Sequence, residues 1–202
     1  MFDEPFRARF AGVARLVTPS LRRAGVTANH VTVAAFVVAV VAAVLIARGH
    51  AVIGVAVWLV SRIGDGIDGV LARETGSSSA FGGYLDITLD MAAYVAVVCA
   101  FAALHPAFVA GWLAVLAGYV LVITTTLALS DAARGSGRKV SATDRTFQFT
   151  AGVTEAGETN VIYALWALFP GHVGWLVWIW AAALLVTTLQ RSYLAWRVLA
   201  RG

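Results

Sequence analysis

The chain has 202 residues, of which 60% are hydrophobic and 13% are charged. An ordinary soluble domain is roughly 45–50% apolar, and a soluble fold of this length could not keep so much apolar surface away from water. The composition therefore excludes a soluble protein and predicts a polytopic membrane protein with a single domain, residues 1–202. The net charge of +4 does not indicate nucleic acid binding, because the basic residues lie in short segments between apolar stretches.

The first 24 residues predict an amphipathic helix that lies on the membrane surface. Five arginines are interspersed with phenylalanine, valine and leucine in this segment. The arginines of such a helix contact anionic headgroups while its apolar side chains enter the interface. We expect residues 25–202 to form the membrane-spanning bundle.

Six apolar segments follow, and each is near the length of about 20 residues that a helix needs to cross the hydrocarbon core. The predicted fold is therefore all-α, a bundle of six transmembrane helices preceded by the amphipathic interfacial helix. The expected spans are Asn29–Ile46, Ala51–Leu71, Ala80–Leu104, Ala107–Leu129, Phe147–Phe169 and Val173–Trp196.

The distribution of lysine and arginine predicts the orientation of this bundle. Thirteen of the fifteen lie in the N-terminal segment, in the connections after the second and fourth spans, or at the C-terminal end. Because cytoplasmic loops carry the excess of positive charge, both termini and these connections are expected in the cytoplasm. The predicted location is the cytoplasmic (inner) membrane.

Four aspartates lie within two consecutive spans, where carboxylates are costly and by default mark function. Asp65 and Asp68 are three residues apart, and Asp86 and Asp90 are four apart, so each pair shares a helix face. The connection between the two helices is short, which makes them antiparallel neighbours. The two pairs should therefore face each other at similar depth, just below the cytoplasmic surface.

Four carboxylates at that range would repel one another unless cations were present. Hard oxygen ligands select ions such as Mg²⁺, Mn²⁺ or Ca²⁺, and four carboxylates suffice for two ions that clamp a reacting phosphate. The alternative is that Arg62 and Arg73 merely neutralise the aspartates. Neighbouring glycines favour a ligand site, because small residues let a ligand or a second helix approach closely.

The spacing of these residues resembles the signature of the CDP-alcohol phosphotransferases, also called CDP-alcohol phosphatidyltransferases. The segment from Thr27 to Thr32 also resembles the family's Thr-Pro-Asn segment, with Ala28 in place of the proline. The matched signature positions are Asp65, Gly66, Asp68, Gly69, Ala72, Arg73, Gly82, Asp86 and Asp90.

The resemblance implies a metal-dependent enzyme that transfers a phosphatidyl-type group from a CDP-linked donor, usually CDP-diacylglycerol, to a hydroxyl acceptor, with release of CMP. All four aspartates would be metal ligands for Mg²⁺ or Mn²⁺, and Asp90 would also act as the base toward the acceptor. The resemblance is compatible with a homodimer. The implied contacts to the CDP donor are Asn29, Gly69, Ala72, Arg73 and Gly82.

A second polar cluster concerns the acceptor. Glu155 and Glu158 are expected deep in the fifth span, where they either neutralise Arg62 or line an acceptor pocket for an amino alcohol or neutral polyol. Arg138 and Lys139, in the preceding loop, either mark the cytoplasmic side or bind an acceptor phosphate. The two clusters point to opposite acceptors, and the sequence does not choose between them.

Two other functions compete with this hypothesis. An intramembrane prenyltransferase also uses aspartate-rich motifs and Mg²⁺, but its two motifs lie on well-separated helices of a larger bundle. A divalent-cation transporter would need acidic residues along a path to the opposite side, and here the cluster lies near one face. CMP release rather than ion flux would distinguish the transferase.

Overall fold

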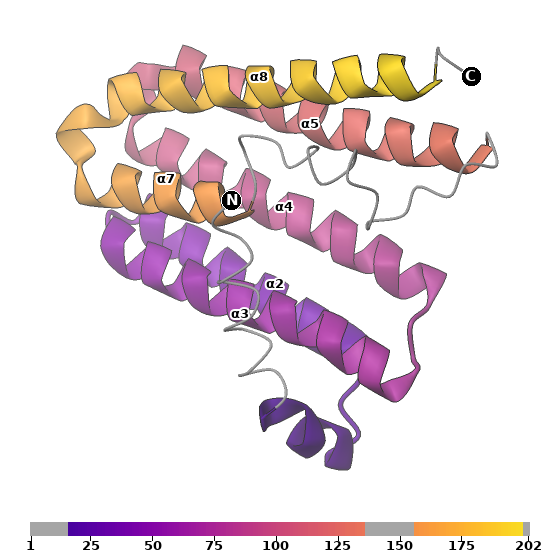
Figure 1. Cartoon of the computed structure of the whole chain (residues 1–202). Helices are drawn as coiled ribbons and strands as arrows, with labels where there is room; N and C mark the ends of the chain where they lie inside the picture. Colours follow the sequence, from indigo (N-terminus) through magenta and orange to yellow (C-terminus); the bar gives the residue numbers. More distant parts are fainter. Residues whose placement is uncertain (1–15, 136–155, 200–202) are drawn as a thin grey trace. The chain divides into compact units, whose positions relative to one another are not determined.

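The structure, a computed structural model, describes residues 16–135 and 156–199, and every regular element in these ranges is helical (Figure 1). The all-α prediction is confirmed. The chain divides into two compact units at Ala107 and Phe108, and the expectation of a single domain stays a prediction. Residues 16–23 are helical, whereas most of the expected N-terminal amphipathic helix lies outside the described residues.

The first unit contains three long helices. They are α2 (Ala28–Ala47), α3 (Ala51–Thr75) and α4 (Ala80–Leu104). The second unit follows a short 3-10 turn, η1 (Pro106–Phe108), and contains α5 (Val109–Gly135), α7 (Ala156–Leu168), the 3-10 turn η2 (Pro170–His172) and α8 (Val173–Leu199).

Four helical segments of the described chain are long and apolar enough to cross a membrane. They are Ala28–Ala47, Ala80–Leu104, Pro106–Ala132 and Pro170–Arg197. Helix α3 is as long as α4 but carries several charged residues, and α7 is described over only 13 residues. A multi-pass membrane protein is therefore confirmed, while the count of six spans stays a prediction.

Helix α2 is the centre of the first unit, because both α3 and α4 pack against it. Its buried face is built mainly from alanines, which let other helices approach closely. A Cβ added at Gly64 of α3 would lie 3.1 Å from the Cβ of Ala35, and one at Gly54 would lie 2.8 Å from the carbonyl oxygen of Ala42. The two glycines therefore set the close contact between α2 and α3.

Local sequence signals define the start of α2, the end of α3 and the start of α4. Thr27 caps α2: its hydroxyl accepts from the backbone N–H of His30, whose imidazole accepts in return from the Thr27 N–H. Helix α3 ends at Gly76, which has a φ of 61°, a conformation that glycine adopts without strain. Ser79 caps α4 by accepting from the N–H of Gly82 at 3.0 Å.

In the second unit, α5 and α8 pack through small residues of α5. A Cβ added at Gly118 would lie 2.8 Å from the Cβ of Leu184, and one at Gly111 would overlap Val177. A polar contact crosses the same pair of helices, since the indole N–H of Trp180 donates to the hydroxyl of Tyr119 at 3.1 Å.

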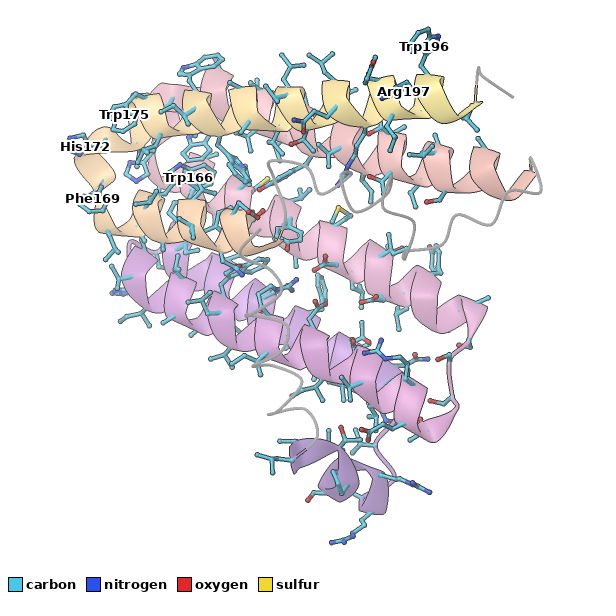
Figure 2. All side chains as sticks on the ribbon, in the orientation of Figure 1. Trp166, Phe169, His172, Trp175, Trp196 and Arg197 are labelled. Carbon is cyan, nitrogen blue, oxygen red and sulfur yellow. The ribbon has the colours of Figure 1, made fainter. Side chains whose placement is uncertain are left out.

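Aromatic side chains mark both ends of α8 (Figure 2). At its first end, His172 lies between the rings of Phe169 and Trp175, with centroids 6.4 and 5.9 Å apart. At its other end, the ring of Trp196 lies 5.9 Å from that of Tyr193. Trp175 and Trp196 are both more than half exposed, as expected of tryptophans at the two lipid headgroup levels.

Candidate active site

Three of the four signature aspartates converge between α3 and α4. Asp65, Asp68 and Asp86 each offer a carboxylate oxygen, and these oxygens lie within 4.8 Å of one another. Asp68 is buried, and the other two are partly exposed. The expectation that the aspartates of the two helices meet is confirmed for these three.

The buried member of this group is fixed by a residue of α2. The hydroxyl of Thr32 lies 2.5 Å from Oδ2 of Asp68 and also 3.1 Å from the carbonyl oxygen of Ala28. Thr32 is itself buried. Hydrogen bonds of this kind orient carboxylates that bind metal and contribute to metal affinity.

Asp90 is held differently from the other three aspartates. Nη1 of Arg62 donates to Oδ1 of Asp90, and the same nitrogen lies 3.8 Å from Oδ2 of Asp65. Among the described residues, the converging group consists of the other three aspartates. The role of Asp90 as a fourth metal ligand stays a prediction.

These contacts also bear on the alternative in which arginines merely neutralise the carboxylates. Arg62 does pair with Asp90 and Asp65. The guanidinium of Arg73 instead lies beside Gly69 on its own helix, where an added Cβ would be 3.4 Å from Nη1. Only one of the two arginines therefore behaves as that alternative requires in the described contacts.

A solvent-open cavity of about 210 Å³ lies next to the aspartate group. Its lining comes from the start of α2, the end of α3 and the start of α4. The sequence predicts these helix ends on the cytoplasmic side. Every position that the family resemblance assigned to the CDP donor lines this cavity. The lining consists of Ala28, Asn29, Thr32, Asp68, Gly69, Ala72, Arg73, Ser77, Ser78, Ser79, Gly82, Gly83 and Asp86.

Gly82 keeps this cavity open where α2 meets α4. A Cβ added there would lie 3.1 Å from Oδ1 of Asn29 and 3.1 Å from the hydroxyl of Ser79. A side chain at this position would crowd both polar groups, so glycine leaves them accessible from the cavity.

Sequence reasoning missed several polar residues of the site. Thr32 follows Asn29 by three residues, a spacing that places both on one face of α2, and this was the available signal. Ser77, Ser78 and Ser79 precede α4, which Ser79 caps, and all three line the cavity.

The predicted acceptor residues are only partly within the described chain. Glu158 lies in the first turn of α7, in the second unit, and is partly exposed. Glu155, Arg138 and Lys139 lie outside the described residues. Their roles stay predictions.

The aspartate group suits a hard divalent cation. Carboxylate oxygens are the ligands that Mg²⁺ and Mn²⁺ prefer, and one ion can bridge oxygens that lie as close as these. The adjacent cavity combines Arg73, serine hydroxyls and an asparagine, which can contact phosphates and a polar ligand. A metal-assisted reaction of a phosphate ester therefore fits the chemistry of the site.

Comparison with known proteins agrees with this chemistry. Residues 25–189 match the family model described as CDP-alcohol phosphatidyltransferase. The chain is 30% identical to the inner membrane protein YnjF of Escherichia coli over 96% of this chain and 94% of that protein. It is 33% identical to a phosphatidylinositol phosphate synthase of Mycobacteroides abscessus over 93% of this chain and 85% of the synthase.

A solved structure shares the fold. The phosphatidylinositol phosphate synthase of Mycobacterium tuberculosis in complex with manganese and citrate has a TM-score of 0.73 and 24% identity, covering 91% of this chain and 88% of the synthase. The same synthase with CDP-DAG bound has a TM-score of 0.67. From the site and these likenesses together, the chain belongs to the CDP-alcohol phosphatidyltransferase family and is a transferase of substituted phosphate groups.

Proposed function

We propose that this protein transfers a phosphatidyl group from CDP-diacylglycerol to a hydroxyl acceptor and releases CMP. The observation that carries the proposal is the placement of Asp68 and Asp86, members of the metal-binding group, in the wall of the cavity that the CDP-contact positions line. The relative from Mycobacterium tuberculosis has a structure with CDP-DAG bound, which supports a lipid donor here.

The donor would lie in the cavity with its nucleotide in water and its acyl chains in the bilayer. Asn29, Gly82 and the serines would contact the cytidine side, and Arg73 would contact the diphosphate. Arg73 suits this role because a guanidinium forms two parallel hydrogen bonds to phosphate oxygens. Gly69 leaves the space in which that guanidinium lies.

The reaction would be a direct displacement at the phosphorus that bears the lipid. The acceptor oxygen forms a new bond to this phosphorus while the bond to the CMP oxygen breaks, and Asp90 accepts the proton of the acceptor hydroxyl. A divalent ion held by Asp65, Asp68 and Asp86 would offset the diphosphate charge and stabilise the leaving CMP. Mg²⁺ and Mn²⁺ both suit these ligands, and the neighbouring synthase structure contains manganese.

The sequence also predicts a second ion that uses Asp90. In the described geometry Asp90 pairs with Arg62, so a second ion would require this carboxylate to leave the arginine. The stoichiometry of Mn²⁺ binding to the purified protein would decide between one ion and two.

The remaining expectations about the membrane belong to this proposal. Six spans are proposed from the six apolar segments, and an N-terminal interfacial helix from the arginines and apolar residues of the first 24 positions. Termini and active site facing the cytoplasm follow from the charge distribution. The location in an inner membrane is supported by the likeness to the inner membrane protein YnjF. A homodimer is proposed from the family resemblance.

The acceptor is a small hydroxyl compound. The names of several relatives, which are phosphatidylinositol phosphate and archaetidylinositol phosphate synthases, favour a phosphorylated polyol, to which Arg138 and Lys139 would bind. Glu155 and Glu158 favour a cationic or neutral acceptor. Glu158→Gln should raise the acceptor KM for a cationic acceptor and leave a phosphorylated one unaffected.

The decisive experiment uses purified protein, CDP-diacylglycerol, Mg²⁺ or Mn²⁺ and a panel of polyols, polyol phosphates and amino alcohols. CMP release that depends on both metal and one acceptor class is expected. Asp68→Asn and Asp86→Asn should abolish it while the proteins still insert in the membrane. Metal-dependent ion flux without CMP release, or near-normal activity in both variants, would contradict the proposal.

A further inference from the structure

The start of α2 forms part of the cavity wall. Ala28, Asn29 and Thr32 all line the cavity. Oδ1 of Asn29 lies 3.1 Å from the place that a Cβ at Gly82 of α4 would take, and the hydroxyl of Thr32 donates to the carbonyl oxygen of Ala28 at 3.1 Å. The conformation of this first turn therefore decides where Asn29 lies in the cavity.

The chain reaches this turn through a short extended link. The helix of residues 16–23 is followed by Gly25, which has a φ of 71°, and Val26 and Thr27 then lead into α2. Proline occupies the position of Ala28 in the family segment that this stretch resembles. A proline at the first position of a helix fixes φ in advance. Ala28 leaves the first turn without that restraint.

His30 supplies a restraint of another kind. Its Nδ1 accepts from the backbone N–H of Thr27 at 3.3 Å, while its own backbone N–H donates to the Thr27 hydroxyl at 3.4 Å. Glutamate or glutamine is the usual residue at this third position of a capping box. The imidazole takes their place here, and Nδ1 accepts when the ring proton is on Nε2.

The imidazole acts on the helix rather than on the contents of the cavity. His30 is exposed, and it is not among the described residues that line the cavity. The residues that its hydrogen bonds enclose, Ala28 and Asn29, do line it. His30 can therefore affect a bound ligand by fixing the turn to which these two residues belong.

We propose that His30 is a positioning residue that holds the first turn of α2, and with it Asn29, in the conformation that binds the CDP donor. This inference rests on the proposed function, in which Asn29 contacts the cytidine side of the donor. A turn that is ordered before binding does not have to be ordered by the ligand, so less binding free energy is lost. The imidazole thus replaces the restraint that proline would give.

CDP binding to the purified protein in detergent with Mn²⁺ present, measured by calorimetry, tests the inference without turnover. His30→Ala should weaken CDP affinity about three- to tenfold, as expected when part of a helix cap is lost, and should leave Mn²⁺ affinity within about twofold. His30→Gln should keep CDP affinity within about twofold, because its amide oxygen can accept the same N–H. His50→Ala is the matched control: His50 is also exposed at a helix start, but its side chain makes no cap hydrogen bond.

An introduced proline provides a second, independent comparison. Thr27 has φ −90° and ψ 162°, close to the conformation of residues that precede proline, and a residue at the first helical position needs no N–H for the helix. In an Ala28→Pro background, His30→Ala should therefore lower CDP affinity by less than about twofold. Comparing the effect of His30→Ala in the two backgrounds cancels any direct effect of the proline on the cavity.

Turnover separates positioning from general stability. His30→Ala should raise the KM for CDP-diacylglycerol by about the same factor as it weakens CDP binding, with kcat and melting temperature nearly unchanged. A histidine that merely stabilised the fold would instead lower melting temperature, Mn²⁺ affinity and kcat together.

Two results would overturn the inference. One is a folded His30→Ala variant with unchanged CDP affinity. The other is a loss of CDP affinity in His30→Gln as large as in His30→Ala, a comparison that holds even if the proline variant does not fold. An unaltered protein that binds no CDP would refute the proposed donor site. Amide hydrogen exchange of residues 28–31 would then still decide the role of His30, since equal exchange rates in His30→Ala and His30→Gln would contradict it.

Discussion

Replacing Thr32 by valine should weaken divalent metal binding, although Thr32 is not itself a metal ligand. Its hydroxyl lies 2.5 Å from Oδ2 of Asp68, and both side chains are buried. Valine keeps the shape of threonine and removes the hydroxyl. Loss of a hydrogen bond to a charged group costs about 1.5–3 kcal/mol, and loss of a partner that orients a metal ligand lowers metal affinity by roughly 10- to 100-fold.

The assay is Mn²⁺ titration of Thr32→Val, Thr32→Ser and the unaltered protein in the same detergent. Serine retains the hydroxyl and should keep most of the affinity. Thr125→Val is a matched control, because the hydroxyl of Thr125 bonds only carbonyl oxygens of its own helix in the contacts described, at 2.8 and 3.1 Å. Unchanged Mn²⁺ affinity in Thr32→Val would refute the reasoning that this hydroxyl fixes Asp68.

Three further predictions concern the cavity, the packing and the orientation. Gly82→Val should lower CDP affinity at least about tenfold while Mn²⁺ still binds, because its Cβ would lie 3.1 Å from Oδ1 of Asn29; unchanged CDP affinity by calorimetry would contradict the assigned cavity. Gly118→Val should lower the stability of the second unit by about 1–3 kcal/mol, since its Cβ would lie 2.8 Å from that of Leu184, and thermal denaturation in detergent would measure this. A cysteine at Gly171 should react with an impermeant reagent from the side opposite the cytoplasm, and cytoplasmic labelling would overturn the six-span topology.

Helix positions were the most predictable part of the fold. The predicted span Ala80–Leu104 is the observed α4, and α2 begins and ends one residue outside the predicted Asn29–Ile46. Long apolar runs with short turns leave little freedom for those boundaries. Helix α3 continues to Thr75, past the predicted end at Leu71, and ends where Gly76 provides the left-handed cap. Ala72 and Arg73 of this added turn line the cavity.

The site was predictable where spacing alone decides which residues share a face. The pairs at i,i+3 and i,i+4 placed Asp65, Asp68 and Asp86 together. Arg62 was expected as a possible partner of the aspartates, but its pairing with Asp90 was not predictable, because it depends on the offset between α3 and α4, which their packing on α2 sets. Thr32 was missed because threonines in membrane helices usually bond their own backbone, and Thr32 does this as well as contacting Asp68.

The tryptophans at the two ends of α8 have a consequence for the lipid that surrounds the protein. Trp175 and Trp196 are 21 residues apart, so they lie about 30 Å apart along a helix, close to the hydrocarbon thickness of a typical bilayer. With both rings at the headgroups, the apolar length of α8 matches such a bilayer with little tilt. In a thinner bilayer, either the lipid would have to thicken locally around α8 or α8 would have to tilt, at a cost of fractions of a kcal/mol per Å of hydrophobic mismatch. Acyl chain length in the host membrane should therefore affect the second unit, even though the proposed site of the reaction lies in the first unit.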